Sequence, residues 1–206
     1  GKTIALVGPT QAGKSLIFEQ LVDALTAELT ESAGSSQPLV SAILATSQDG
    51  RVSPKHVTLR LLKAVNHPMY MHIGELDERS HYVPSRNRSE SSLRMALESA
   101  LDSRKVLYVA LDEAHHLTHT PNQAVRANVL QSIKCLGAID RTLFLCGGYE
   151  LAYRGLFDSA HFAGRLIVIE IPPYGHSKED FVEWRRILKT LSSYLPLQTP
   201  SLLIDE

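Results

Sequence analysis

The chain has 206 residues, of which 44% are hydrophobic and 21% charged, with a formal net charge of −1 at pH 7. This length is enough for one large domain, or for a core domain with a small part of a second, and the composition is that of a globular protein. The charge balance excludes a generally basic protein, so any contact with nucleic acid has to come from a local patch.

Targeting and membrane signals are missing from the sequence. No apolar run approaches the roughly 20 residues that cross a bilayer, and no signal peptide is visible. We therefore expect a cytoplasmic protein with no membrane association. The chain begins at Gly1 and enters an apolar strand almost at once, so we also expect it to be a segment of a longer protein.

Apolar runs alternate with helical periodicities along the chain. Buried strands are predicted at 3–7, 39–45, 105–111, 142–146 and 166–171. Helices are predicted at 14–31, 53–65, 89–101, 122–136 and 177–194. This alternation predicts an α/β fold in three layers, with a five-stranded, mainly parallel sheet covered on both faces. Residues 66–88 show no clear period, and we expect a long loop or insertion there.

Residues 8–15 read GPTQAGKS, directly after the first strand and at the start of a helix. Glycines in such a loop let the backbone curl so that its N–H groups point at phosphate oxygens, and the helix dipole favours the same anion. Lys14 adds a full positive charge for the β- and γ-phosphates, and Ser15 adds a hydroxyl ligand for Mg²⁺. The residues expected to bind a nucleoside triphosphate are Gly8, Pro9, Thr10, Gln11, Ala12, Gly13, Lys14, Ser15 and Leu16.

The third predicted strand runs into two carboxylates, VLYVALDE. Charges at the end of a buried strand are costly unless they serve a site. We expect Asp112 to join the Mg²⁺ shell beside Ser15, and Glu113 to orient the attacking water in ATP hydrolysis. The two motifs therefore predict an ATPase core over residues 1–176, followed by a final helix and tail over 177–206.

Three histidines, His115, His116 and His119, follow the carboxylates. His115 and His119 are four residues apart, so they could share a helix face and bind a metal. No HExxH string is present, and we interpret the histidines as polar residues around the mouth of the site. The string DEAH also names a helicase class, but the further helicase motifs and a second RecA-like domain are missing from this sequence.

The order of motifs resembles the AAA+ ATPases, and among them the TniB/TnsC-type regulators of bacterial transposition. The resemblance covers nearly the whole chain and rests on GPTQAGKS, SPKHVTLRLL, VLYVALDEAHHL, TLFLCGGYEL and FAGRLIVIEIPPY. It implies a homo-oligomer, a ring or filament, that assembles with ATP on double-stranded DNA and links a target-selecting protein to a transposase. The helix at 177–194 would then be the start of an incomplete helical lid.

The resemblance also implies site residues beyond the two motifs. ATP would lie between subunits, and the neighbour would supply an arginine to the γ-phosphate, with Arg165 as the first candidate and Arg154 as the second. DNA contacts would come from the loop and helix after the second strand, with Arg51, Lys55 and His56 as candidates.

One departure from the family concerns the fourth strand, which usually ends in glycine and then a polar residue that senses the γ-phosphate. Here the pair is Gly147-Gly148, so either Tyr149 or a neighbour replaces the sensor, or hydrolysis is slow. Two other functions stay open at this point. One is a signalling or defence NTPase that oligomerises on a protein trigger without DNA, and the other is a secretion-type AAA+ ATPase.

Overall fold

The computed structural model describes residues 1–33, 36–44, 52–67, 74–76, 82–84, 89–119, 122–137, 140–157, 162, 164–173, 175 and 177–194. The chain divides into two compact units, Gly1–Ile171 and Pro172–Glu206. The first unit holds the sheet and its covering helices, and the second holds one long helix.

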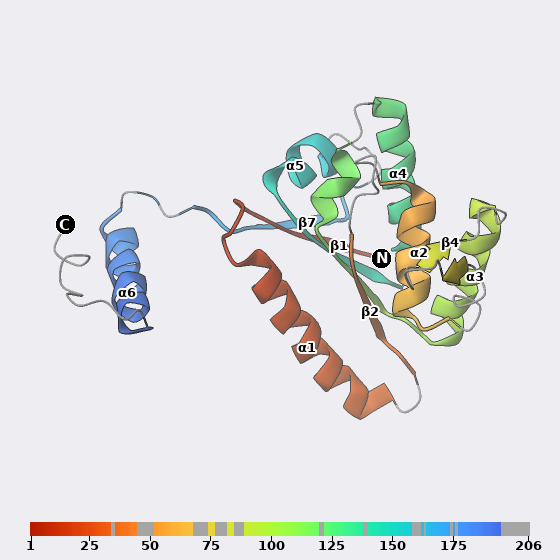
Figure 1. The fold of residues 1–206 in the computed structure, drawn as a ribbon, viewed down its shortest axis with the longest axis horizontal. Helices are drawn as coiled ribbons and strands as arrows, with labels where there is room; N and C mark the ends of the chain where they lie inside the picture. Colours follow the sequence, from red (N-terminus) through yellow and green to blue (C-terminus); the bar gives the residue numbers. More distant parts are fainter. Residues whose placement is uncertain are drawn as a thin grey trace. The chain divides into compact units, whose positions relative to one another are not determined.

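Five parallel strands form the centre of the first unit (Figure 1). They are β1 (Thr3–Val7), β2 (Leu39–Ile43), β5 (Tyr108–Asp112), β6 (Thr142–Gly147) and β7 (Leu166–Glu170). Their order across the sheet is β2-β5-β6-β1-β7. From β1 the chain passes to the edge strand β2, returns through β5 and β6, and then adds β7 on the other side of β1. The predicted α/β fold with a five-stranded parallel sheet is confirmed.

Helices cover both faces of this sheet. Helix α1 (Lys14–Ala33) lies on one face, while α2 (Pro54–Ala64), α3 (Glu90–Ser103) and α4 (Gln123–Leu136) lie on the other (Figure 1). The larger apolar core is on the side of α2, α3 and α4, and it includes the fully buried Leu61, Leu97 and Ile133. Beneath α1 is a smaller cluster around Phe18 and Cys146. The central strands β1, β5 and β6 are largely buried on both faces, which explains their continuous apolar runs, whereas Ile43 of β2 and Ile167 and Ile169 of β7 are exposed.

Side-chain caps determine where α2 and α4 begin. The Ser53 hydroxyl accepts a hydrogen bond from the His56 N–H at 3.2 Å, and Pro54 occupies the first helical position of α2. Asn122 Oδ1 accepts hydrogen bonds from the N–H groups of Ala124 and Val125 at the start of α4. Each cap satisfies a backbone donor that has no partner within its helix.

The structure differs from the expected elements in several places. The stretch 66–88, expected as a loop, contains the antiparallel pair β3 (Gly74–Leu76) and β4 (Tyr82–Pro84), which are too short to show a sequence period. Strand β5 begins at Tyr108 instead of Lys105, because Lys105 adopts a left-handed backbone conformation with φ of 56°. The 3₁₀ helix η2 (Ala114–Thr118) was not expected, whereas the helix expected after the fourth strand, on which Arg154 lies, is present as the short α5 (Tyr149–Leu151) and the π-helical turn η3 (Ala152–Leu156).

The second unit contains α6 (Lys178–Tyr194). A capping box begins it: the Ser177 hydroxyl accepts from the Asp180 N–H at 3.1 Å, and Asp180 Oδ2 accepts from the Ser177 N–H at 3.3 Å. Among the residues that the structure describes, neither this helix nor any other combines the length and apolar character required to cross a membrane.

Candidate nucleotide site

The carboxyl ends of β1, β5 and β6 meet at one edge of the sheet. Val7 pairs with Gly147, and β5 ends at Asp112, so the loops that follow these strands lie side by side. Together they enclose a pocket with a volume of about 530 Å³. Its lining consists of Thr10, Gln11, Gly13, Lys14, Ser15, Leu16, Asp112, Glu113, His115, His119, Gly147, Gly148 and Glu150. Such an edge of an open parallel sheet is where ligands of α/β proteins bind.

The loop between β1 and α1 has the curled backbone that the sequence predicts. Gly13 has φ of 76°, and Gln11 has φ of 64°, so two of its residues are left-handed. A Cβ atom at Gly8 would lie 2.8 Å from the Ile171 carbonyl oxygen, which explains why glycine is needed where the loop leaves the sheet. The predicted residues Gly8, Pro9 and Ala12 form this loop without lining the pocket themselves.

Lys14 and Ser15 open helix α1 at the pocket. The ammonium group of Lys14 donates a hydrogen bond to the Pro9 carbonyl oxygen, which ties the side chain across the loop. The first α1 turn is already hydrogen-bonded, with the Ile17 N–H donating to Gly13 at 3.0 Å. A helix N-terminus, a charged ammonium and a curled loop therefore face the same space, as anion binding requires.

Asp112 is the buried carboxylate of this pocket, with 9% of its surface exposed. One of its oxygens, Oδ1, accepts the Glu113 N–H at 2.7 Å, and the Cys146 thiol lies within hydrogen-bonding reach of the carboxylate. Burial, and next the negative charge of Asp112, raise the pKa of the Cys146 thiol, so this cysteine stays a neutral thiol beneath the pocket. The hydroxyl of Ser15 and the carboxylate of Asp112 are hard oxygen donors in one pocket, and this donor set fits Mg²⁺.

Glu113 is held in an unusual backbone conformation. Its φ of 53° and ψ of 32° are left-handed, which is rare for a residue other than glycine and is concentrated at functional sites. The residue precedes the first turn of η2 and lines the pocket. Its Oε2 lies 3.2 Å from His115 Nδ1. The backbone strain places the carboxylate at the pocket, where an attacking water would be oriented.

Close packing requires the glycine at position 147 of the Gly147-Gly148 pair. A Cβ atom at Gly147 would lie 2.9 Å from the backbone nitrogen of His115, so the turn after β5 packs against this glycine and leaves no room for a side chain. Tyr149 does not line the pocket, because its hydroxyl donates to the Ile171 carbonyl oxygen at 3.3 Å. The neighbour that does line the pocket from this turn is Glu150.

The histidines come together because the turn after Glu113 is a 3₁₀ helix, in which residues three apart share a side. His116 Nδ1 and His119 Nδ1 are 3.3 Å apart, and the three rings contact one another, with centroids 4.3 to 5.3 Å apart. Burial, and next the charges of His115 and His119, lower the pKa of His116 against the opposing effect of Glu113. The sequence suggested only the pair His115 and His119, because a 3₁₀ turn has no clear signature in a single sequence.

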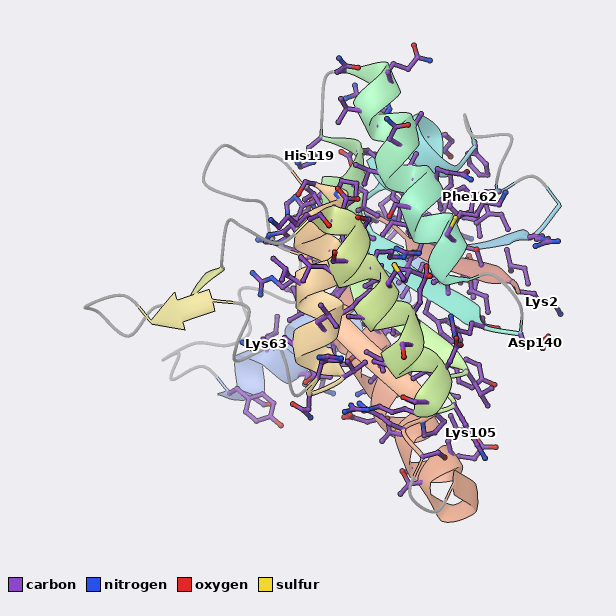
Figure 2. All side chains as sticks on the ribbon, turned by 90° about the vertical axis from the view of Figure 1, so that its right-hand side faces the viewer. Lys2, Lys63, Lys105, His119, Asp140 and Phe162 are labelled. Carbon is purple, nitrogen blue, oxygen red and sulfur yellow. The ribbon has the colours of Figure 1, made fainter. Side chains whose placement is uncertain are left out.

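Neither candidate arginine lines the pocket. Arg165 lies before β7, where its carbonyl oxygen accepts the Thr3 N–H at 2.9 Å, and it borders a separate cavity of about 230 Å³. This position is at the amino edge of the sheet, the edge opposite the nucleotide pocket. Figure 2 shows the two edges: Lys2, Lys105 and Asp140, which precede strands, lie on the other side of the domain from His119. Arg154 is exposed on η3.

The candidate DNA contacts lie in and before the first turn of α2. Lys55 and His56 are half-buried there, and His56 Nε2 accepts a hydrogen bond from Arg60 Nε at 3.4 Å. Neither Lys55 nor His56 lines the nucleotide pocket. Arg51, the third candidate, lies outside the described residues.

Comparison with solved structures shows what the fold resembles. The chain is similar to the Orc1 protein of Aeropyrum pernix, solved in complex with DNA, with 17% identity and a TM-score of 0.61 over 94% of this chain and 44% of that one. It is also similar to Cdc6p of Pyrobaculum aerophilum, with 17% identity and a TM-score of 0.58 over 98% and 46%. A Walker-type ATPase of Pyrococcus abyssi matches with 16% identity and a TM-score of 0.54 over 98% and 57%. The chain therefore spans about half the length of these proteins.

A search of curated proteins finds no significant match. The family comparison does, and it agrees with the site: the model described as AAA domain matches residues 1–154 of the 206. Membership supports nucleotide binding and ATPase activity in general. This chain belongs to the AAA family of P-loop ATPases.

Proposed function

We propose that this protein is an AAA+ regulator that binds and hydrolyses ATP, oligomerises with ATP on double-stranded DNA, and links target selection to a transposase. One observation carries the proposal. The pocket has its phosphate loop, Asp112 and Glu113, but no arginine lines it among the described residues. Such a pocket binds nucleotide in one subunit and is completed by the next, so ATP controls assembly.

Within one subunit we assign the following roles to the residues of the pocket. The N–H groups of the loop and the ammonium of Lys14 bind the phosphates, while Glu113 accepts a proton from the attacking water. Ser15 and Asp112 would hold Mg²⁺, which would supply positive charge to neutralise the phosphates. Gly148, which stands where the family places its polar sensor of the γ-phosphate, has no side chain, and this supports slow hydrolysis and a long-lived ATP state.

Arg165 is the residue that we assign to the neighbour's site. It is exposed and lies at the amino edge of the sheet, a strand's length from its own pocket. A head-to-tail assembly brings the amino edge of one subunit against the carboxyl edge of the next. A planar, permanently charged guanidinium then meets the γ-phosphate and stabilises its developing charge.

DNA binding is proposed for the first turn of α2, through Lys55 and His56, together with Arg51. A net charge of −1 means that one subunit has little general attraction for DNA, so binding depends on many subunits acting together. The fold's similarity to an Orc1 protein solved with DNA supports the idea without identifying the surface. The transposase and target-selector partners rest on the resemblance of the sequence motifs to TniB/TnsC-type regulators.

The test is assembly on DNA in the presence of a slowly hydrolysed ATP analogue. Electron micrographs of the chain with a long duplex should show rings or filaments with the analogue, and none with ADP. Lys55→Ala should remove ATP-dependent DNA binding in a gel-shift assay while nucleotide affinity is unchanged. Lys63→Ala is the matched control, because Lys63 is an exposed lysine in the last turn of the same helix (Figure 2).

The results of these experiments distinguish the DNA-bound regulator from the signalling or defence NTPase. Assembly with the analogue but without any need for DNA would contradict the DNA role and favour the signalling or defence NTPase. Equal DNA binding by Lys55→Ala and Lys63→Ala would show that the first turn of α2 is not the DNA surface.

A further inference from the structure

The histidine cluster (His115, His116 and His119) is a second group of ligands at the rim of the nucleotide pocket. Each ring offers one nitrogen, and these three nitrogens lie within 4.8 Å of one another. The Ser15 and Asp112 pair offers only oxygen, so the two sets of donors have different chemistry. Imidazole nitrogen suits zinc and other transition metals, whereas oxygen suits Mg²⁺.

One pair of nitrogens in the cluster already has the separation of two ligands on a single ion, and the third lies within 4.8 Å of them. His116 Nδ1 and His119 Nδ1 are 3.3 Å apart. Two nitrogens bound to the same tetrahedral zinc ion, at about 2.0 Å from it, are themselves roughly 3.3 Å apart. The 3₁₀ form of η2 holds this pair, since residues three apart lie on one side of such a helix, and the His119 N–H donates to the His116 carbonyl oxygen at 3.3 Å.

His115 has an orientation that suits a metal ligand. Its Nδ1 is buried without a hydrogen bond and lies 3.2 Å from Glu113 Oε2. A histidine that binds a metal through one nitrogen usually directs the N–H of the other nitrogen to a carboxylate, which fixes the ring. The Glu113 carboxylate is in the place of that outer partner, and Nε2 of His115 is then the nitrogen that faces an ion.

We propose that His115, His116 and His119 bind one divalent transition-metal ion of the zinc type at the rim of the pocket. Three imidazoles leave one position of a tetrahedral ion open. His115 and His119 line the nucleotide pocket, so this position faces water or a phosphate oxygen there. The bound ion ties η2 together and, through His115, holds the Glu113 side chain in place.

The turn after Glu113 is held by hydrogen bonds within the turn itself, and a metal ion bound to the histidine rings would stabilise it further. The Thr118 hydroxyl donates to the His115 carbonyl oxygen at 2.7 Å, and the His116 N–H donates to Glu113 at 3.1 Å. These bonds hold the backbone but none of the three rings. A metal ion adds bonds to the rings themselves, and so it fixes the left-handed Glu113 and its turn as a unit.

The experiment measures zinc binding by the untagged chain, stripped with a chelator, without ATP or DNA. Calorimetric titration with Zn²⁺ should give one ion per chain, and Co²⁺ should give the visible absorption of a tetrahedral nitrogen site. His116→Ala and His119→Gln should each weaken Zn²⁺ binding by at least about tenfold to a hundredfold, the loss that follows removal of even an outer partner of a ligand. His67→Ala is the control, because His67 lies beyond the end of α2 and outside the cluster.

Because His119 is exposed, His119→Gln should keep the melting temperature of the metal-free wild type, which shows that the variant is folded. Zn²⁺ binding that is undetectable in the wild type, or equal in the wild type and in both cluster variants, would overturn the proposal. Neither result bears on assembly with ATP and DNA, so a failure here is distinct from a failure of the proposed function.

Discussion

The two edges of the central sheet differ in the functional groups that they carry, and in the proposed function these groups belong to one reaction. The carboxyl edge holds Lys14, Ser15, Asp112 and Glu113 around a pocket of about 530 Å³. The amino edge holds Arg165, hydrogen-bonded through its backbone to Thr3. The length of β1 separates the edges, roughly 13 Å at the rise of a strand.

Because the groups lie at opposite edges of the sheet, they can meet only if two subunits contribute to one site. A parallel sheet directs all its strand ends one way, so one domain collects its phosphate and metal ligands at one edge only. Arg165 at the amino edge is too far away to reach the pocket of its own subunit, but it can reach the pocket of a neighbouring subunit. The four predictions below test this contrast, from the largest expected effect to the smallest.

The largest effect is expected at the amino edge. Arg165→Ala should lower the ATPase rate of the assembled protein by about a thousandfold, because a trans-acting arginine stabilises charge in the transition state. Nucleotide affinity of the unassembled chain should not change. Steady-state hydrolysis on DNA and nucleotide binding without DNA are the two measurements.

Mixing subunits sharpens this prediction. Arg165→Ala and Glu113→Gln are each expected to be inactive alone, but random mixing would make about a quarter of the interfaces complete, with glutamate from one subunit and arginine from the next. Recovery of activity therefore supports a shared site. Arg154→Ala is the matched variant: if its loss and complementation match those expected for Arg165, the assignment passes to Arg154.

Glu113→Gln should reduce hydrolysis by a factor on the order of several hundred, since it removes the general base without removing a phosphate ligand. ATP affinity should stay close to that of the wild type, and the assembled state should last longer. Single-turnover hydrolysis measures the first effect, and a fluorescent ATP analogue the second. A variant that turns over ATP at the wild-type rate would exclude Glu113 as the base.

Lys14→Ala should weaken ATP binding by about a hundredfold, through loss of charged hydrogen bonds to the phosphates. Equilibrium binding of ATP measures this effect, with Lys63→Ala as the control for loss of one positive charge. If ATP controls assembly as proposed, rings or filaments should disappear at concentrations where the wild type forms them. Unchanged ATP affinity would show that Lys14 does not bind the phosphates.

The smallest effect is expected where the two turns at the carboxyl edge pack together. Gly147→Ala should destabilise the fold by about 2 kcal/mol, because the new Cβ meets the backbone of His115 and displaces the turn that carries Glu113. Urea unfolding monitored by circular dichroism measures this loss. Gly13→Ala is a useful comparison: its Cβ would meet nothing within 4 Å, so any loss there comes from the left-handed backbone with φ of 76°. A neutral Gly147→Ala would show that the turns are not packed as described.

The sequence predicts those parts of the site whose structure depends on residues that are adjacent in the chain. The residues GPTQAGKS specify the curled conformation of their loop and the start of α1, and Ser53-Pro54 specifies the N-terminal cap of α2. Continuous apolar runs predict parallel strands because both faces of the sheet are covered. Strand β1 was predicted with its observed bounds for this reason, whereas β3 and β4 were missed because three-residue strands have no period.

The sequence by itself determined the phosphate loop, the two carboxylates and the fold class, because local backbone chemistry and burial leave few alternatives there. Only the tertiary structure decided three other matters: that His115 fills the space beside Gly147, that Tyr149 bonds to Ile171 away from the pocket, and that Arg165 is at the opposite edge. Each of these depends on segments far apart in the chain packing together. A linear pattern does not record such contacts.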